Sequence, residues 1–191
     1  MSQLALRREN CVLLIIDFQE RLAAAMSEKR MKRALGNTNI LLEAARRMGI
    51  PVVLSEQYPK GLGPTVEALR ASLDGIDELT RLEKLDFSVC AAEGFSEVSQ
   101  RLESKQRNQW LVTGMETHIC LYQSARALCE SGASVHLAVD GVVSRATNNY
   151  NVGLGLAEAS GAHLTSTETI VMDLLGRAGN DDFKAISKLI R

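Results

Sequence analysis

An α/β fold, with a six-stranded and mostly parallel sheet covered by helices on both faces, is predicted by two features of the sequence. Strand patterns and helix patterns alternate from one end of the chain to the other, as in proteins built from strand–helix–strand units. The stretch "CVLLIID" is a continuous apolar run ending in a carboxylate, which is typical of a central strand buried on both faces. No repeat or linker-like stretch interrupts this order, so we expect a single domain over residues 1–191.

Periodicity and turn residues place the individual elements. Leu41, Leu42, Ala45 and Met48 recur at helical spacing, and Gly49 ends that helix before the next strand. The stretch "YPKGLGP" is expected to be a loop because of its Pro and Gly content. Strands are expected at 11–17, 51–55, 77–85, 109–114, 134–141 and 162–166. Further helices are expected at 65–72, 93–104, 121–132, 150–161, 168–176 and 183–191.

Charge and composition argue against several classes of function. The 22 basic and 23 acidic residues give a net charge of −1, so we expect no general attraction to nucleic acid or to anionic lipid. No stretch approaches the ~18 consecutive apolar residues of a membrane span. The first residues lack the apolar core of a secretion signal, so we expect a cytoplasmic protein. The four cysteines form no C-x-x-C pair and are expected to remain thiols.

No metal or other cofactor is expected. His118, His136 and His163 stand isolated along the chain, without the partners of a zinc site. The glycines at Gly153 and Gly155 do not directly follow a strand and lack the full G-x-G-x-x-G spacing of a dinucleotide loop.

Three residues of interest fall at the carboxyl ends of predicted strands. In a parallel sheet, ligands and chemistry gather at this edge, and Asp17, Lys84 and Cys120 all lie there. Each residue alone also fits a structural role: Asp17 as a helix cap, Lys84 as a surface lysine and Cys120 as a core residue. Their coincidence at one edge favours a catalytic site.

Cys120 has a further argument from its immediate neighbours. In "TGMETHIC", Thr117 is predicted to cap a helix whose first turn contains Cys120. The free amides of a first turn, and an ammonium such as that of Lys84, favour a thiolate. Asp17 is the candidate to take the thiol proton and return it to a leaving nitrogen. We interpret Cys11, Cys90 and Cys129 as structural.

Six stretches, in order, resemble the isochorismatase-like cysteine hydrolases, and in particular their isochorismatase domain-containing branch. They are "LLIIDFQERL", "SEQYPKGLGPTV", "EKLDFSVC", "TGMETHICLYQSA", "AVDGVVSR" and "GAHLTSTETIVMDLLG". The resemblance implies a Rossmann-like three-layer fold and a catalytic triad of Asp17, Lys84 and Cys120. It also implies a cis peptide between Met115 and Glu116, an oxyanion hole formed by the backbone amides of Glu116 and Cys120, and a homo-oligomer, at least a dimer.

Departures from relatives narrow the expected chemistry. Nicotinamidases of this superfamily carry an Asp and two His metal ligands after the second strand, where this chain has "SEQYPKGLG". A metal-dependent nicotinamidase is therefore disfavoured. True isochorismatases lack the nucleophilic cysteine, so Cys120 disfavours that activity.

The sequence therefore predicts a hydrolase that cleaves an amide-type or ureide-type C–N bond of a small molecule through a Cys120 thioester. The side chains expected to line a small substrate pocket are Phe18, Gln57, Tyr58, Phe87 and His118. The alternative is an oligomeric interaction or scaffold domain with vestigial catalytic activity.

Overall fold

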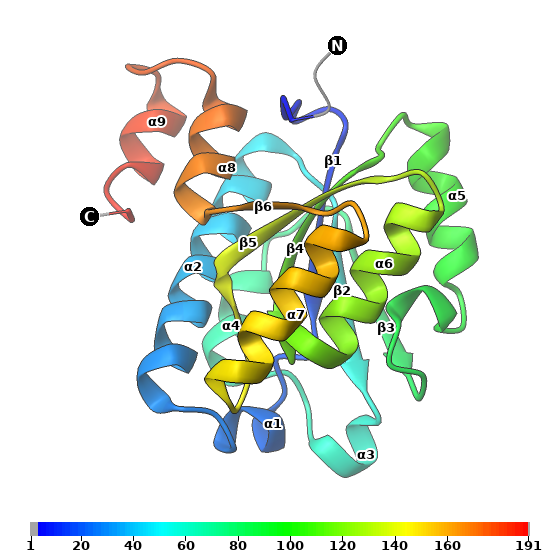
Figure 1. Ribbon diagram of the computed structural model, residues 1–191. Coiled ribbons are helices and arrows are strands. Elements are labelled where there is room, and N and C mark those ends of the chain that lie inside the picture. The colour runs from blue at the N-terminus through cyan, green and yellow to red at the C-terminus, as the bar shows by residue number, and fades with distance from the viewer. Residues whose placement is uncertain (1–3, 191) are drawn as a thin grey trace.

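The computed structural model describes residues 4–190, which fold into one six-stranded sheet with helices packed on both of its faces (Figure 1). The strands are β1 (Cys11–Ile16), β2 (Val52–Gln57), β3 (Leu79–Lys84), β4 (Gln109–Met115), β5 (Ser134–Val143) and β6 (His163–Thr165). All neighbouring strands pair in parallel, in the order β3-β2-β1-β4-β5-β6. This arrangement confirms the predicted fold class.

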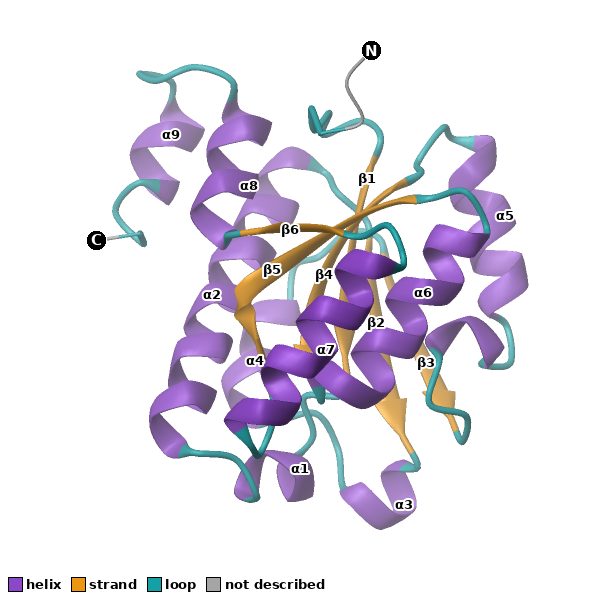
Figure 2. Cartoon of the chain, viewed as in Figure 1, coloured by secondary structure: helices purple, strands orange, loops and turns teal. Residues whose placement is uncertain are grey.

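The helices connect these strands in an α/β alternation (Figure 2). They are α1 (Glu20–Ala24), α2 (Glu28–Met48), α3 (Pro59–Leu62), α4 (Glu67–Leu73), α5 (Phe95–Ser104), α6 (Tyr122–Glu130), α7 (Thr147–Ala159), α8 (Thr167–Leu175) and α9 (Asp181–Ile186). A 3₁₀ turn, η1 (Val89–Ala91), and a π-helical turn, η2 (Thr117–Leu121), complete the order.

Two hydrophobic layers hold the helices to the sheet, because side chains of β1 alternate between its faces. Leu13 and Ile15 pack into a core formed with α2, α4, α8 and α9. Leu14 and Ile16 pack into a second core formed with α5, α6 and α7. Every residue of β1 is fully buried, as the apolar run predicts for a strand covered on both sides.

The structure differs from the sequence prediction mainly in short elements. The expected loop at 58–64 contains the one-turn helix α3, with a proline at its start. The short elements α1 and η1 were not predicted, because elements of five and three residues are too short to show a periodicity in the sequence. The last helix ends at Ile186 rather than running to the end of the chain, and residue 191 lies outside the described residues.

Strand order fixes where the chain can build a site. β1 and β4 are neighbours at the centre of the sheet. The chain adds β2 and β3 on the outer side of β1, and it adds β5 and β6 on the outer side of β4. The carboxyl ends of two such strands leave a crevice between the loops that follow them. Asp17 follows β1, and η2 follows β4 after Glu116.

Candidate active site

Asp17 is fully buried and held in a single orientation at the end of β1. Its backbone has a φ of 52°, a left-handed conformation that Asp adopts more readily than most residues. The Ser55 hydroxyl donates to Oδ1 at 2.7 Å, and the Lys84 ammonium donates to Oδ2 at 2.6 Å. Both carboxylate oxygens are therefore satisfied, one by a group from β2 and the other by a group from β3.

Lys84 ends the edge strand β3 and turns its ammonium into the protein. Its side chain and that of Asp17 are both 0% exposed, so the pair is a buried ion pair. Nζ also donates to Oε1 of Gln57 at 2.7 Å, and the Cys120 thiol lies 3.9 Å from the same oxygen. The amide of Gln57 thus joins the lysine to the cysteine.

Cys120 lies in the π-helical turn that follows β4, and it is 6% exposed. The structure brings it together with Asp17 and Lys84, both of which act on its pKa. One detail of the sequence prediction is wrong. Thr117 is the first residue of η2 rather than its cap, Glu116 precedes the turn, and the Thr117 hydroxyl makes no hydrogen bond among the described residues.

The surroundings of the Cys120 thiol act on its pKa in both directions. Burial raises the pKa of its thiol to about 12; the Asp17 carboxylate adds to this increase, and Lys84 acts in the lowering direction. Burial and the Asp17 carboxylate therefore oppose the effect of Lys84, which alone would favour the thiolate.

Two buried polar side chains that the sequence analysis did not single out brace the loops around the site. Gln19 donates from Nε2 to the carbonyls of Gln57 at 3.0 Å and Gly63 at 2.7 Å, and its Oε1 accepts the Gln57 N–H at 2.7 Å. Ser124 donates to the Cys120 carbonyl at 2.7 Å and accepts the Val89 N–H at 2.9 Å. Ser124 could have been found by its spacing, four residues after Cys120 on one helix face.

The turn before Cys120 contains the Met115–Glu116 peptide, which is cis, as the resemblance implies. The Glu116 amide donates to no protein acceptor within residues 4–190, whereas the next amide, that of Thr117, donates to Ser144 Oγ at 3.0 Å. Arg145 binds the Glu116 carboxylate through its backbone N–H and its side chain. Arg145 was also not singled out from the sequence.

The five side chains expected to line a substrate pocket have different surroundings. Phe18 is fully buried in the core, while Tyr58 and Phe87 are about half exposed, at 51% and 52%. The Gln57 amide is engaged with Lys84 and with the Leu85 carbonyl. The Nδ1 atom of His118 lies 3.2 Å from the Oγ atom of Ser144. Contact of these side chains with a substrate stays a prediction.

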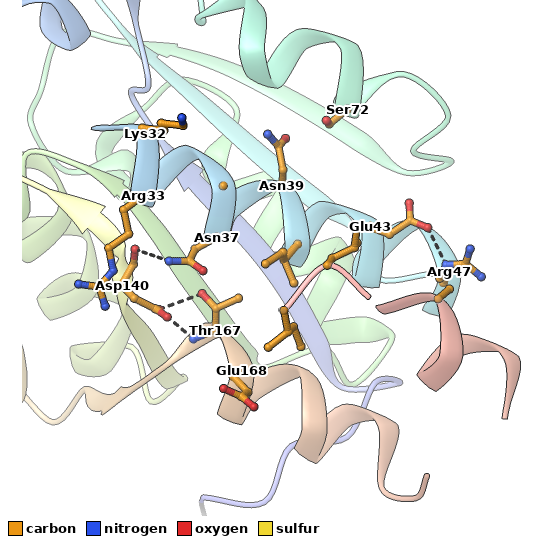
Figure 3. Close-up of a pocket in the computed structure, with 15 residues that line it drawn as sticks. Lys32, Arg33, Asn37, Asn39, Glu43, Arg47, Ser72, Asp140, Thr167 and Glu168 are labelled. Atoms are coloured by element: carbon orange, nitrogen blue, oxygen red, sulfur yellow. Dashed lines mark hydrogen bonds and ion pairs between the residues drawn. The ribbon is translucent and has the colours of Figure 1, made fainter. Parts of the chain in front are cut away.

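Cavities lie both beside the site and away from it. A cavity of about 480 Å³ is lined by Tyr58 and Lys84, together with the chain around Leu85. A cavity of about 910 Å³ lies instead beside α2, where Asn37 donates to the Asp140 carbonyl and Thr167 donates to the Asp140 carboxylate (Figure 3). Of the three residues Asp17, Lys84 and Cys120, Lys84 lines the first cavity and none lines the second.

Close packing of α7 on η2 fixes the position of the turn that carries Cys120. A Cβ placed on Gly153 would lie 2.5 Å from the Thr117 carbonyl carbon and 2.6 Å from the His118 nitrogen. On Gly155, two residues later in the same helix, it would meet nothing within 4 Å. The glycine at 153 is therefore required by the approach of the two backbones.

Alanine substitutions at these two glycines should have opposite effects on stability. Gly153→Ala is expected to lower the free energy of unfolding by ~1–3 kcal/mol, because backbone atoms must move to admit the methyl group. Gly155→Ala should raise it by up to ~1 kcal/mol, since alanine favours a helix. Urea unfolding of both variants measures the difference, and a Gly153→Ala variant as stable as Gly155→Ala would contradict the close contact.

Two kinds of feature, a membrane-spanning helix and a metal-binding cluster, are both absent from the described residues. Within residues 4–190, no helix is both long and apolar enough to cross a membrane. In the same part of the chain, His, Cys, Asp and Glu side chains do not gather in groups of three or more that could hold a metal ion.

The fold and the site define an α/β protein with a cysteine-centred site at the carboxyl edge of a parallel sheet. A family model described as the isochorismatase domain matches residues 11–169. The chain belongs to the isochorismatase family, which confirms the resemblance found in its sequence and supports a hydrolase function.

Individual relatives agree with this assignment. The chain is 38% identical to isochorismatase domain-containing protein 2 of Bos taurus over 152 residues, which cover 79% of this chain and 70% of that protein. It is 32% identical to the secreted isochorismatase effector Isc1 of Phytophthora sojae over 180 residues, which cover 94% and 84%.

Solved structures extend the comparison to the whole fold. The MAR1 ribonuclease from Caenorhabditis elegans superposes with a TM-score of 0.86 at 31% identity, over 97% of this chain and 91% of that one. YcaC from Pseudomonas aeruginosa, described with hexane-2,5-diol and covalent acrylamide, has a TM-score of 0.83 over 99% and 93% of the chains. At 19% identity, this second likeness shows the fold alone.

Proposed function

We propose that this protein is a cysteine hydrolase that cleaves an amide-type or ureide-type C–N bond of a small molecule, with Asp17, Lys84 and Cys120 as its catalytic triad. The observation that carries the proposal is the buried Asp17–Lys84 ion pair beside the Cys120 thiol. A buried pair of this kind is costly to maintain for stability alone, and it meets a nucleophile at the edge where chemistry gathers.

In the first half of the reaction, Asp17 takes the thiol proton as Sγ of Cys120 attacks the substrate carbonyl carbon. Lys84, with its positive charge beside both groups, favours the developing thiolate. The carbonyl oxygen becomes an oxyanion and accepts hydrogen bonds from the backbone amides of Glu116 and Cys120. The C–N bond then breaks, Asp17 returns the proton to the leaving nitrogen, and the acyl group remains on Cys120 as a thioester.

In the second half, Asp17 deprotonates a water molecule, which attacks the thioester carbonyl. The C–S bond breaks, the proton returns to the Cys120 sulfur, and the acid product leaves. The same carboxylate thus serves as base, acid, base and acid again, and ends the cycle ionised as it began.

The remaining expectations belong to the same proposal. We propose a homo-oligomer; the YcaC gene product of Escherichia coli, similar in fold at 17% identity, is described as an octameric hydrolase. We also propose a cytoplasmic location, although one relative is named as a secreted effector. Phe18, Gln57, Tyr58, Phe87 and His118 are proposed to contact the substrate.

The proposal is tested by measuring hydrolysis of a panel of small amides, ureides and carbamoyl compounds, with an RNA oligonucleotide included because one similar structure is named a ribonuclease. Cys120→Ala is expected to abolish C–N hydrolysis, and the matched variant Cys90→Ala to retain it. Activity retained in Cys120→Ala, or RNA cleavage in place of amide cleavage, contradicts the proposal. Under the scaffold alternative, an electrophilic amide would label Cys90 and Cys120 equally and no compound would turn over.

A further inference from the structure

A buried carboxylate occupies the turn that leads to Cys120. The Glu116 side chain is 4% exposed, whereas that of its partner Arg145 is 59% exposed. The Arg145 backbone N–H donates to Oε2 at 2.9 Å, and its Nε donates to Oε1 at 3.0 Å and to Oε2 at 3.2 Å. The loop after β5 therefore holds this carboxylate from one residue, through both main chain and side chain.

We propose that Arg145 is a positioning residue of the oxyanion hole and acts through the Glu116 carboxylate. The inference rests on the proposed function, in which the backbone N–H of Glu116 stabilises the oxyanion. That amide and the bound carboxylate belong to one residue, so the contacts to Arg145 also restrain the direction of the amide. Preorganised donors of this kind are effective because they need no reorientation during reaction.

The charge of Arg145 is needed as well as its geometry. Negative charge develops on the substrate beside the backbone of Glu116, whose own side chain is an anion. An unmatched carboxylate there would oppose the oxyanion, and the guanidinium removes most of that repulsion. Without Arg145, the buried carboxylate would lack a counter-charge and turn toward solvent, moving the amide with it.

Two reactions of Cys120 separate this role from general damage to the site. Attack on p-nitrophenyl acetate forms an oxyanion, expels p-nitrophenolate and leaves an acetyl thioester on the sulfur. Attack on iodoacetamide displaces iodide and forms no oxyanion. The ratio of the two second-order rate constants, each corrected with Cys120→Ala, therefore reports the oxyanion hole independently of thiol reactivity.

Arg145→Gln is expected to slow acylation by roughly tenfold, less than the ~10²–10³ lost with a whole oxyanion donor, and to leave alkylation unchanged. Adding Glu116→Gln should restore acylation to the rate of the Glu116→Gln single variant, because the uncompensated charge is then gone and Gln still accepts the Arg145 backbone N–H. Arg126→Gln, which removes an exposed contact to Glu130 on α6, is the matched control and should change neither rate.

The inference is overturned if Arg145→Gln leaves the ratio of rates unchanged, or if acylation and alkylation fall together. It is also overturned if loss of Arg145 slows acylation equally with Glu or with Gln at position 116. Should Arg145→Gln fail to fold, Arg145→Lys, which keeps the charge but not the Nε donor to both carboxylate oxygens, takes its place in the same two rate measurements. The proposed function fails separately, if p-nitrophenyl acetate acylates wild type no faster than Cys120→Ala.

Discussion

Asp17→Asn is expected to abolish turnover while lowering the pKa of the Cys120 thiol. Asn keeps the shape of the side chain but cannot accept the proton, so a loss of ~10²-fold to 10⁴-fold is expected from general-base catalysis alone. The Asp17 carboxylate is one cause of the raised pKa of Cys120, and Lys84 acts in the opposite direction. Removing the carboxylate leaves burial and Lys84, so the thiolate forms at lower pH in the variant.

Thiolate absorbance near 240 nm, titrated with pH, measures this second effect. Subtracting the same titration of a variant that also carries Cys120→Ala isolates one cysteine from the other three. Asp77→Asn, a substitution at an exposed position just before β3 and at the opposite end of that strand from Lys84, controls for the change in net charge and should leave the titration unchanged. A Cys120 pKa that rises in Asp17→Asn, or turnover that survives, contradicts the assignment of Asp17 as the base.

The sequence predicted the parts of the fold that depend on long, uniform patterns. The apolar run of β1 and the strand–helix alternation led to the correct sheet, and the ends of β1 and β3 gave Asp17 and Lys84 as neighbours. The short elements α1 and α3 were missed because tertiary contacts define them. Gln19 and the Gly63 carbonyl, for example, meet across 44 residues of chain.

The electrostatic state of the site was less accessible from the sequence. The start of a helix and a nearby lysine are visible in the residue order, and both favour a thiolate. The depth of burial and the position of the Asp17 carboxylate are known only from the fold, and they reverse the direction of the pKa shift. The Glu116–Arg145 pair was missed for a related reason, because 29 residues separate its two members.

The buried charges of Lys84 and Asp17 lower the stability of the folded protein unless other groups compensate for their loss of hydration. Taking Lys84 and Asp17 out of water costs several kcal/mol per ion, which only good geometry and additional hydrogen bonds repay. Ser55 and the Gln57 amide supply those additional bonds. The buried pair is thus balanced as a unit, and removing one member should cost more than removing both.

Lys84→Met should therefore lower the free energy of unfolding by ~3–5 kcal/mol, because it leaves the Asp17 carboxylate buried without its counter-charge. The double variant that adds Asp17→Asn should recover most of this loss, since neither remaining side chain is charged. Neither variant should turn over substrate. Urea unfolding followed by circular dichroism gives the free energies, and the panel of small amides gives the activities.

An exposed ion pair provides the matched control for that experiment. Lys184 and Asp181 lie 3.3 Å apart on α9, with side chains 65% and 97% exposed, so Lys184→Met should change stability by less than ~1 kcal/mol. If the double variant at positions 17 and 84 were no more stable than Lys84→Met, the two charges would not be coupled in the folded protein. A double variant that regains most of the lost stability but remains inactive would instead mean that the pair is retained for its chemistry. Neutral side chains at positions 17 and 84 would then meet nearly all the needs of the fold.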